Sequence, residues 1–125
     1  MLSNREARAT LPAKDLNRAR KFYAEKLGLT PTSENPGGLT YKLNGCTEFF
    51  LFPSSGQSTG TFTQIGWQTD NIEAEVAELK SRGVVFEEYD LPNFKTVGSI
   101  FTTSGNRSAW FKDSEGNLHG VVQFT

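Results

Sequence analysis

The sequence is poor in sulfur and histidine: its 125 residues include one cysteine, one methionine and one histidine. A single cysteine, Cys46, excludes an internal disulfide and fits a reducing compartment, so we expect a cytoplasmic protein. Long apolar runs are also absent, and stretches such as Phe49 to Phe52 fall far below the roughly 20 residues of a membrane span. No charged and then apolar leader precedes Pro12, so we do not expect secretion.

An excess of charge of either sign is missing as well. Thirteen Lys and Arg residues stand against 14 Asp and Glu, which gives a formal net charge of -1. No basic stripe is available for a phosphate backbone, so neither nucleic acid nor a membrane is an expected partner. The chain does contain 36% apolar and 12% aromatic residues, enough for one core. We therefore expect a single domain over residues 1–125.

In the first half, the pattern predicts a strand, a helix and further strands. Residues 8–13 alternate as a strand does, and Asp15 is a suitable cap for a helix that stops at Gly28. Apolar side chains recur on one face of that helix, at Leu16, Ala19, Tyr23 and Leu27. Turn residues then separate strands at 39–43 and 47–52, and a linker rich in Ser, Gly, Thr and Gln follows at 54–61.

The second half repeats this order of elements. A strand is predicted at 62–69, followed by a helix with Asp70 and Glu73 as a capping box and Gly83 as its stop. The remaining strands are predicted at 84–88, 107–112 and 118–124, with a long irregular stretch at 91–106. A half-buried sheet of this kind must pair with its copy to cover a face. The repeat thus predicts two βαβββ modules, at about 7–53 and 62–125.

The end of the chain carries the most specific pattern. Asp113-Ser114-Glu115-Gly116-Asn117 is a turn cluster between aromatic Trp110-Phe111 and an apolar strand from Leu118 to Phe124, which is typical of a hairpin. Together with Lys14-Asp15-Leu16 opening a helix that ends Leu27-Gly28-Leu29, this ending resembles the vicinal oxygen chelate superfamily, the glyoxalase, bleomycin-resistance and extradiol dioxygenase relatives. The resemblance implies an α+β fold of paired βαβββ modules that form a curved, cup-shaped mixed sheet with helices on the outer face. It also implies ligand binding inside the cup and a homodimer.

Metal-using members of that superfamily carry one ligand on each of four cup strands. The resemblance puts these positions at Arg8, Phe49, Gln64 and Gly120. Arginine has no lone pair to donate, Phe and Gly have no donor side chain, and neutral Gln is a weak ligand. We therefore expect no metal and no other cofactor.

A shift of one residue in both hairpin strands would change this prediction. It would bring Glu48 and His119 beside Gln64, and this set keeps a metal-dependent enzyme open as an alternative. His119 is the only histidine, and because Gly120 holds the inward position we expect His119 on the helix-facing side or at the sheet margin, as a structural residue. Nothing resembles a nucleophile elbow, so no catalytic residue is predicted.

The face assignment predicts a cup with polar and apolar walls. The first strands send Arg8, Thr10 and Pro12, then Gln64, Gly66 and Gln68, inward, while their neighbours pack under the helices. The stretch at 91–106 is too apolar for a solvent loop and is either a lid or a satellite cluster at the sheet edge. Arg8 either meets a ligand or forms a salt bridge with Glu48 or another acid. The predicted ligand-binding residues are Arg8, Thr10, Phe49, Leu51, Gln64, Gln68, Phe101, Val122 and Phe124.

These patterns predict a glyoxalase- or bleomycin-resistance-like protein that binds a small, partly apolar molecule in its cup without a metal. Two alternatives stay open. One is a divalent-metal-dependent lyase, isomerase or dioxygenase of the same superfamily. The other is a non-catalytic interaction module whose cup is filled by its own aromatic side chains.

Overall fold

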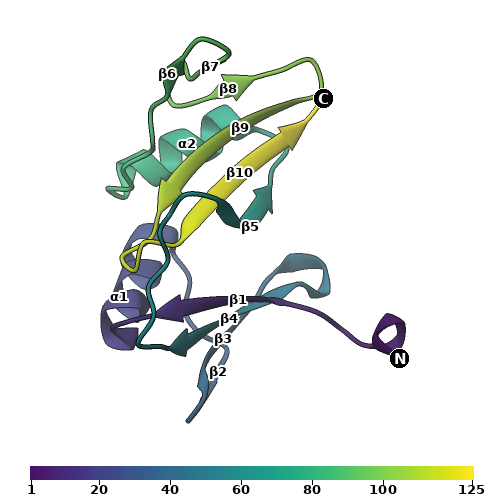
Figure 1. Cartoon of the computed structure of the whole chain (residues 1–125), viewed down its shortest axis with the longest axis vertical. Helices are drawn as coiled ribbons and strands as arrows, with labels where there is room; N and C mark the ends of the chain where they lie inside the picture. Colours follow the sequence, from purple (N-terminus) through teal and green to yellow (C-terminus); the bar gives the residue numbers. More distant parts are fainter.

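The first half forms a four-stranded mixed sheet covered by one helix, as the computed structural model of residues 1–125 shows (Figure 1). A short 3-10 helix at Leu2–Asn4 precedes it. The elements are β1 (Ala9–Ala13), α1 (Leu16–Leu27), β2 (Ser33–Asn35), β3 (Gly38–Lys42) and β4 (Glu48–Pro53). The strand order is β1-β4-β3-β2, in which β1 runs parallel to β4 and the other pairs are antiparallel.

The second half repeats this topology. Its elements are β5 (Thr63–Gln68), α2 (Ile72–Ser81), β8 (Phe101–Thr102), β9 (Asn106–Lys112) and β10 (Leu118–Phe124), with the strand order β5-β10-β9-β8. Two short strands, β6 (Asp90–Leu91) and β7 (Phe94–Lys95), form a separate antiparallel ribbon. The predicted fold class, α+β with paired βαβββ modules, is confirmed.

The helices begin and end at small polar residues and glycine. The Asp15 side chain accepts a hydrogen bond from the backbone N–H of Arg18 at 3.0 Å, and Gly28 ends α1 in the left-handed region at φ 69°. The predicted capping box at the start of α2 is wrong by one residue. Asn71, not Asp70, caps this helix, since its side chain accepts from the backbone N–H of Ala74 at 3.1 Å.

The strand predicted at 84–88 is also wrong. Val84 and Phe86 are buried and Val85 is 82% exposed, so the side chains do alternate as in a strand. However, only Phe86 forms a bridge, to Phe111 of β9, and the backbone N–H of Glu87 donates to the Trp110 carbonyl at 2.8 Å. The segment therefore meets the edge of β9 at one point and does not continue as a strand.

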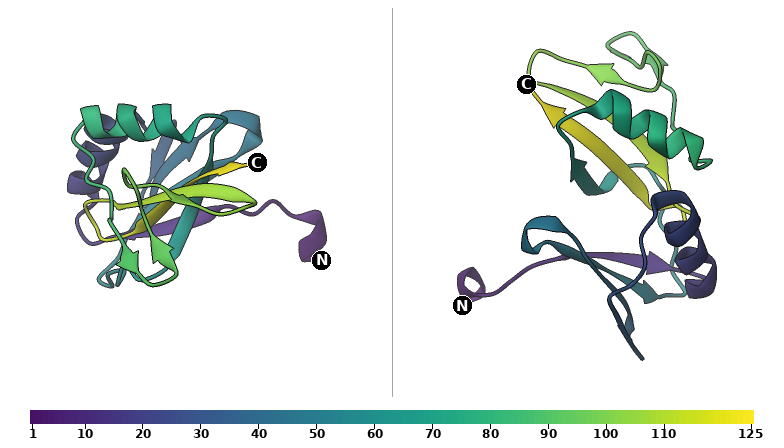
Figure 2. Two further views of the ribbon diagram at one scale, coloured as in Figure 1. Left: turned by 90° about the horizontal axis from the view of Figure 1, so that it is seen from above. Right: turned by 180° about the vertical axis from the view of Figure 1, so that it is seen from behind.

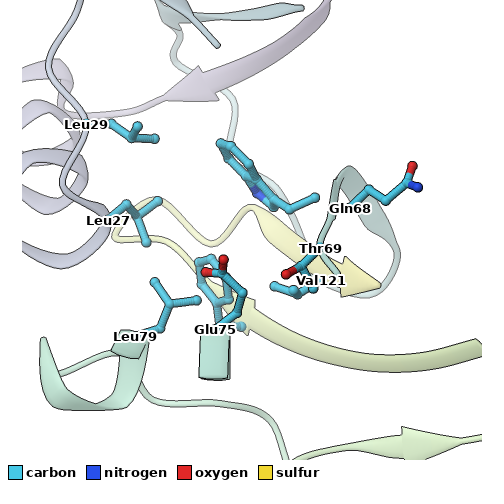
Figure 3. A pocket seen from close by; sticks show the side chains of 9 residues that line it. Leu27, Leu29, Gln68, Thr69, Glu75, Leu79 and Val121 are labelled. Atoms are coloured by element: carbon cyan, nitrogen blue, oxygen red, sulfur yellow. The ribbon is translucent and has the colours of Figure 1, made fainter. Parts of the chain in front are cut away.

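Each sheet packs its own core against its own helix. Ala19 and Tyr23 of α1 pack on the first sheet, and Ile72 and Val76 of α2 pack on the second. Trp67 touches both cores, as the half-buried side chains Phe22 and Leu27 also do. A cavity of about 220 Å³ lies where the two cores meet (Figure 3).

The two sheets stay separate and do not close into a barrel (Figure 2). The segment before β1 extends away from the first sheet and ends in the exposed side chains of Met1 and Leu2. Neither helix has the length and apolar character needed to cross a membrane.

Candidate functional site

The face of each sheet that lies away from its helix, here called the helix-free face, corresponds to the cup that the resemblance implies. In the second half, Ala109 and Val121 point into the core under α2. Side chains alternate along a strand, so Trp110, Gly120 and Val122 lie on the helix-free face. The alternation therefore separates two surfaces of different chemistry.

Two neighbouring glycines without side chains, Gly66 and Gly120, lie on this face and are here called the glycine shelf. Gly120 pairs with Gly66 on one side and with Trp110 on the other. A Cβ on Gly66 would find no atom within 4 Å, whereas a Cβ on Gly120 would lie 3.4 Å from the Trp110 indole. The indole N–H donates to the Thr63 hydroxyl at 3.2 Å, which holds the ring in place. The shelf is therefore open over the exposed Gly66 and covered over the buried Gly120 by Trp110 and Thr63.

Three more aromatic rings surround Trp110. Phe94 and Phe101 stack with ring centroids 4.4 Å apart, and Phe94 lies 5.3 Å from Trp110. Tyr89 meets Trp110 edge-on at 5.8 Å. Of the two predicted roles for the stretch 91–106, the structure has the satellite cluster, because its aromatic side chains pack on the sheet margin around Trp110.

The segment that carries Phe94 is held by Glu88. The Glu88 carboxylate accepts hydrogen bonds from the Ser99 hydroxyl and, at 2.9 Å, from the Thr96 hydroxyl. These bonds, the one from Ser99 first, hold the pKa of Glu88 below its usual value although burial opposes them. An ionised Glu88 thus fixes the position of the aromatic cluster.

The helix-free face of the first half is more polar. The Arg8 guanidinium pairs with Glu48 at 2.5 Å and lies 4.5 Å above the ring of Phe50. The predicted salt bridge between Arg8 and Glu48 is therefore the arrangement in the structure. Thr10 is exposed beside them and pairs in register with Phe50.

Phe49 and Leu51 do not lie on this face, so their predicted place in the cup wall is wrong. Both are completely buried against α1, in one cluster with Leu11 and Tyr23. The turns before β4 and β10 have the same length, since Lys42 pairs with Glu48 and Lys112 with Leu118. The place that Gly116 takes in its turn, with φ 84°, is taken in the first turn by Cys46, with φ 63°, and not by Gly45. The helix-free position four residues further on is therefore Phe50 in β4, as it is Gly120 in β10.

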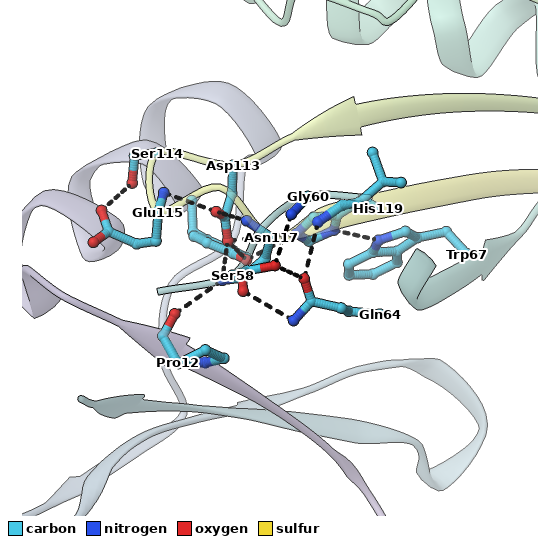
Figure 4. Close-up of polar contacts among 12 residues, drawn as sticks. Pro12, Ser58, Gly60, Gln64, Trp67, Asp113, Ser114, Glu115, Asn117 and His119 are labelled. Carbon is cyan, nitrogen blue, oxygen red and sulfur yellow. Dashed lines mark hydrogen bonds and ion pairs between the residues drawn. The ribbon is translucent and has the colours of Figure 1, made fainter. Parts of the chain in front are cut away.

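The Gln64 side chain does not face the cup as predicted. A bulge beside Leu118 and His119 interrupts the register of β5, and the Gln64 amide turns toward the turn at 113–117 (Figure 4). Its oxygen accepts from the Ser58 hydroxyl and its nitrogen donates to Asn117 at 3.0 Å. Both polar atoms of the Gln64 amide are therefore hydrogen-bonded within the chain.

His119 is completely buried on the helix-facing side, as predicted. Its Nδ1 accepts from the indole N–H of Trp67 at 3.0 Å, and its Nε2 lies 2.9 Å from the Tyr23 hydroxyl. An indole nitrogen can only donate, so the imidazole proton sits on Nε2 and points at Tyr23. The Tyr23 hydroxyl in turn donates to Asp113 Oδ2 at 2.6 Å. Every donor in this chain of bonds has one acceptor, which leaves neither ring nitrogen free.

The protonation states agree with this direction. Burial, together with the nearby Asp113 carboxylate, raises the pKa of the Tyr23 hydroxyl well above its ordinary value of 10.0, so Tyr23 stays a donor. Burial opposes ionisation of Asp113, but the His119 ring and the hydrogen bonds from Tyr23 and Asn117 hold the Asp113 pKa below 3.8. Asp113 is thus an ionised acceptor at the end of the chain.

The turn at 113–117 also ties the two halves together. The buried Glu115 carboxylate accepts from Arg18 Nε at 2.8 Å and from the backbone N–H of Asp15 at 2.9 Å, both at the start of α1. The Asn117 amide donates to the Pro12 carbonyl at 2.9 Å (Figure 4). The motif that carried the resemblance is therefore a structural clamp between the halves.

The residues do not fit a metal centre. His119 has both nitrogens engaged on the helix-facing side, Glu48 is paired with Arg8, and the Gln64 amide serves the turn at 113–117. No group of three or more His, Cys, Asp or Glu side chains comes close enough to hold an ion. The donor set required by the metal-dependent alternative does not come together in the chain.

The predicted site residues that lie on the helix-free faces are divided between the two sheets. Arg8, Thr10, Gln68, Phe101, Val122 and Phe124 lie on the helix-free faces. The prediction missed Trp110 as a site residue, although the turn at 113–117 sets the hairpin register and places Trp110 opposite Gly120. It also missed the aromatic partners Tyr89 and Phe94, which no local pattern connects to Trp110.

Comparison with known proteins agrees with this geometry. A family model described as the Glyoxalase/Bleomycin resistance protein/Dioxygenase superfamily matches residues 6–119. No curated protein matches the sequence.

Several solved structures share the fold. TnmS3, an antibiotic binding protein from Streptomyces sp. CB03234, superposes with a TM-score of 0.69 at 24% identity, covering 98% of each chain. A bleomycin-binding protein complexed with bleomycin has a TM-score of 0.69 at 20% identity, covering 96% of this chain and 98% of that one. UcmS2 has a TM-score of 0.73 at 20% identity, covering 94% and 96%.

Proposed function

The chain belongs to the glyoxalase/bleomycin resistance protein/dioxygenase superfamily, and we propose that it binds a small, partly apolar molecule on its helix-free face without a metal. The observation that carries this proposal is the glycine shelf beside Trp110. Ligand sites combine an apolar surface with a few polar groups. The shelf, its aromatic wall and the nearby Gln68 side chain provide both.

A planar ligand suits this surface better than a branched one. Gly66 is exposed with open space above it, so a flat ring can approach its backbone closely beside Trp110, where any side chain would hold it off. Aromatic contact with Trp110 would add about 0.5–1.5 kcal/mol beyond the area buried. Two solved neighbours are named as antibiotic- or bleomycin-binding proteins, which supports a binding role on the same fold.

The polar groups favour binding over catalysis. The only imidazole is buried with both nitrogens engaged, and the Arg8 and Glu48 charges neutralise each other at 2.5 Å. General acid–base catalysis requires a group with a free proton or lone pair in reach of the substrate. Metal-free binding is consistent with this arrangement, and elemental analysis of the purified protein tests it directly: one divalent ion per chain would contradict it.

The proposal includes a homodimer. In one chain the two helix-free faces belong to separate sheets that do not close around a ligand. Pairing of two copies would bring a second surface over the shelf and bury exposed apolar side chains such as Phe62 and Phe124, which are 63% and 60% exposed. Light scattering measures the mass directly, and a mass of 13.8 kDa, that of one chain, at micromolar concentration would contradict this part.

The experiment that tests the binding site is Gly66→Leu. Because the space above Gly66 is open, the new side chain should cover the shelf without disturbing the fold. The probes are bleomycin and acridine, with tryptophan fluorescence as the readout. We expect saturable quenching in the native protein and at least a tenfold loss of affinity in the variant.

A matched control uses Gly105, where a Cβ also meets nothing within 4 Å. Gly105→Leu adds the same side chain away from the shelf and should leave affinity unchanged. Equal affinities for Gly66→Leu and the native protein would show that the ligand binds elsewhere.

A further inference from the structure

A half-open pocket lies on the opposite side of the second sheet from the glycine shelf. This junction cavity, of about 220 Å³, is the one where the two cores meet (Figure 3). Leu27 and Leu29 of the first half form one wall, and Leu79 of α2 faces them. Trp67, Phe111 and Val121 of the second sheet line it as well. The walls are therefore apolar and come from both halves.

One carboxylate turns toward this apolar space. Figure 3 shows the Glu75 side chain over the cavity, between Leu79 and Val121, with the Thr69 hydroxyl beside it, while the Gln68 side chain points away. The other acidic residues of α2 are paired: Glu73 with Arg107 at 2.7 Å and Glu78 with Arg82 at 3.1 Å. Glu75 forms no ion pair in the chain, so its charge is available to a ligand.

An apolar cavity with one unpaired carboxylate at its edge matches a particular ligand chemistry. The carboxylate accepts hydrogen bonds from an ammonium group, and the Thr69 hydroxyl offers a second acceptor. A neutral or anionic molecule of the same shape would leave Glu75 without a partner or repel it. We propose that the junction cavity binds a small apolar primary ammonium ion, with its hydrocarbon part among Leu27, Leu79 and Val121 and its nitrogen at Glu75.

The size of the cavity limits the buried part of the ligand to about one ring. An apolar cavity of about 150 Å³ is sufficient for benzene. A volume of about 220 Å³ therefore takes one ring with an aminomethyl group. Drug-sized ligands need roughly 300 Å³ or more. The junction cavity is thus distinct in ligand size, as well as in position, from the glycine shelf.

The two tryptophans allow ligand binding at the two sites to be measured separately. Trp67 lines the junction cavity, and Trp110 lies on the helix-free face. In a Trp110→Phe variant, Trp67 is the remaining indole and its fluorescence reports on the cavity. The probes are benzylamine, which is cationic at neutral pH, and benzyl alcohol, which has the same ring and no charge.

We expect saturable fluorescence changes with benzylamine and at least tenfold weaker binding of benzyl alcohol. Glu75→Gln keeps the shape of the side chain, removes its charge, and should abolish the tenfold preference. Glu73→Gln, two residues away on the same helix, should retain it because Glu73 is paired with Arg107. Leu79→Phe should reduce the affinity for both probes at least fivefold by filling the cavity.

Three results would overturn the proposal. The first is the absence of saturation by benzylamine, and the second is equal affinity for amine and alcohol. The third is an unchanged preference in Glu75→Gln, whose exposed position makes misfolding of the variant no explanation. Gly66→Leu should leave benzylamine binding intact, so failure at the shelf and failure at the junction cavity are distinguishable.

Discussion

Two buried tyrosines give a direct test of the hydrogen-bonded chain around His119. The Tyr23 hydroxyl donates to Asp113 at 2.6 Å and lies 2.9 Å from His119 Nε2, and Tyr23→Phe removes both contacts. A hydrogen bond to a charged group contributes about 1.5–3 kcal/mol and a neutral one about 0.5–1.5 kcal/mol. Because Phe is easier to bury than Tyr, we expect a net loss of about 2–4 kcal/mol in the free energy of unfolding. At about 4 °C per kcal/mol, the melting temperature should fall by about 8–16 °C.

Tyr41 is the matched control. It is also fully buried, 5.5 Å from Tyr23, and stacks on Phe49 at 4.7 Å, but its hydroxyl has no hydrogen-bond partner. Tyr41→Phe removes an unsatisfied polar atom and should leave stability unchanged or raise it by up to about 2 kcal/mol. Urea denaturation followed by circular dichroism measures both variants. Equal losses for the two variants would refute the role assigned to Tyr23.

Three further predictions concern the charged contacts. The folded pKa values of Asp113 and Glu115 lie below their ordinary values of 3.8 and 4.5. As the pH falls, these carboxylates therefore take up protons in the unfolded chain before they do so in the folded one. The free energy of unfolding should keep its full value above about pH 5 and fall as the pH drops through the folded pKa values. Urea midpoints between pH 7 and pH 3 measure this dependence, and midpoints that do not change with pH would contradict it. Arg18→Met leaves the buried Glu115 carboxylate without its ion-pair partner. It should therefore lower the melting temperature more than Arg20→Met, because the partner of Arg20, Glu34, is exposed. Glu88→Ala should increase amide hydrogen exchange at 96–100 relative to Glu87→Ala, and equal exchange would show that Glu88 does not hold the aromatic segment.

Much of the fold could be predicted because local signals agreed with the tertiary arrangement. The helix from Asp15 to Gly28 has its cap, its apolar face and its stop in the sequence, and each is used in the structure. The prediction for 84–88 failed because alternation reports only which side chains are buried. It does not report how much of a backbone finds a partner, and this segment pairs with β9 at Phe86 alone.

The site was harder to predict, since it depends on register. Cys46 takes the left-handed place in the turn before β4 that Gly116 takes in the turn before β10, so Phe49 lies in the core and Phe50 on the helix-free face. A left-handed place favours glycine, so the sequence pointed to Gly45 and set the register off by one residue. The side chains around Trp110 come from 89–101, and their contacts with β9 form only when the segment folds back over the sheet. Such long-range contacts leave no periodic signal.

Because the clamp at 113–117 joins the two halves through side-chain contacts, we expect their association not to require the peptide bonds between them. Glu115, Asn117 and Asp113 reach Arg18, Pro12 and Tyr23 across the whole length of the chain, while Ser55 and Gly56 are exposed. Fragments 1–55 and 56–125 should consequently recombine in trans, and the scaffold is suited to a split reporter whose reassembly needs no covalent bridge.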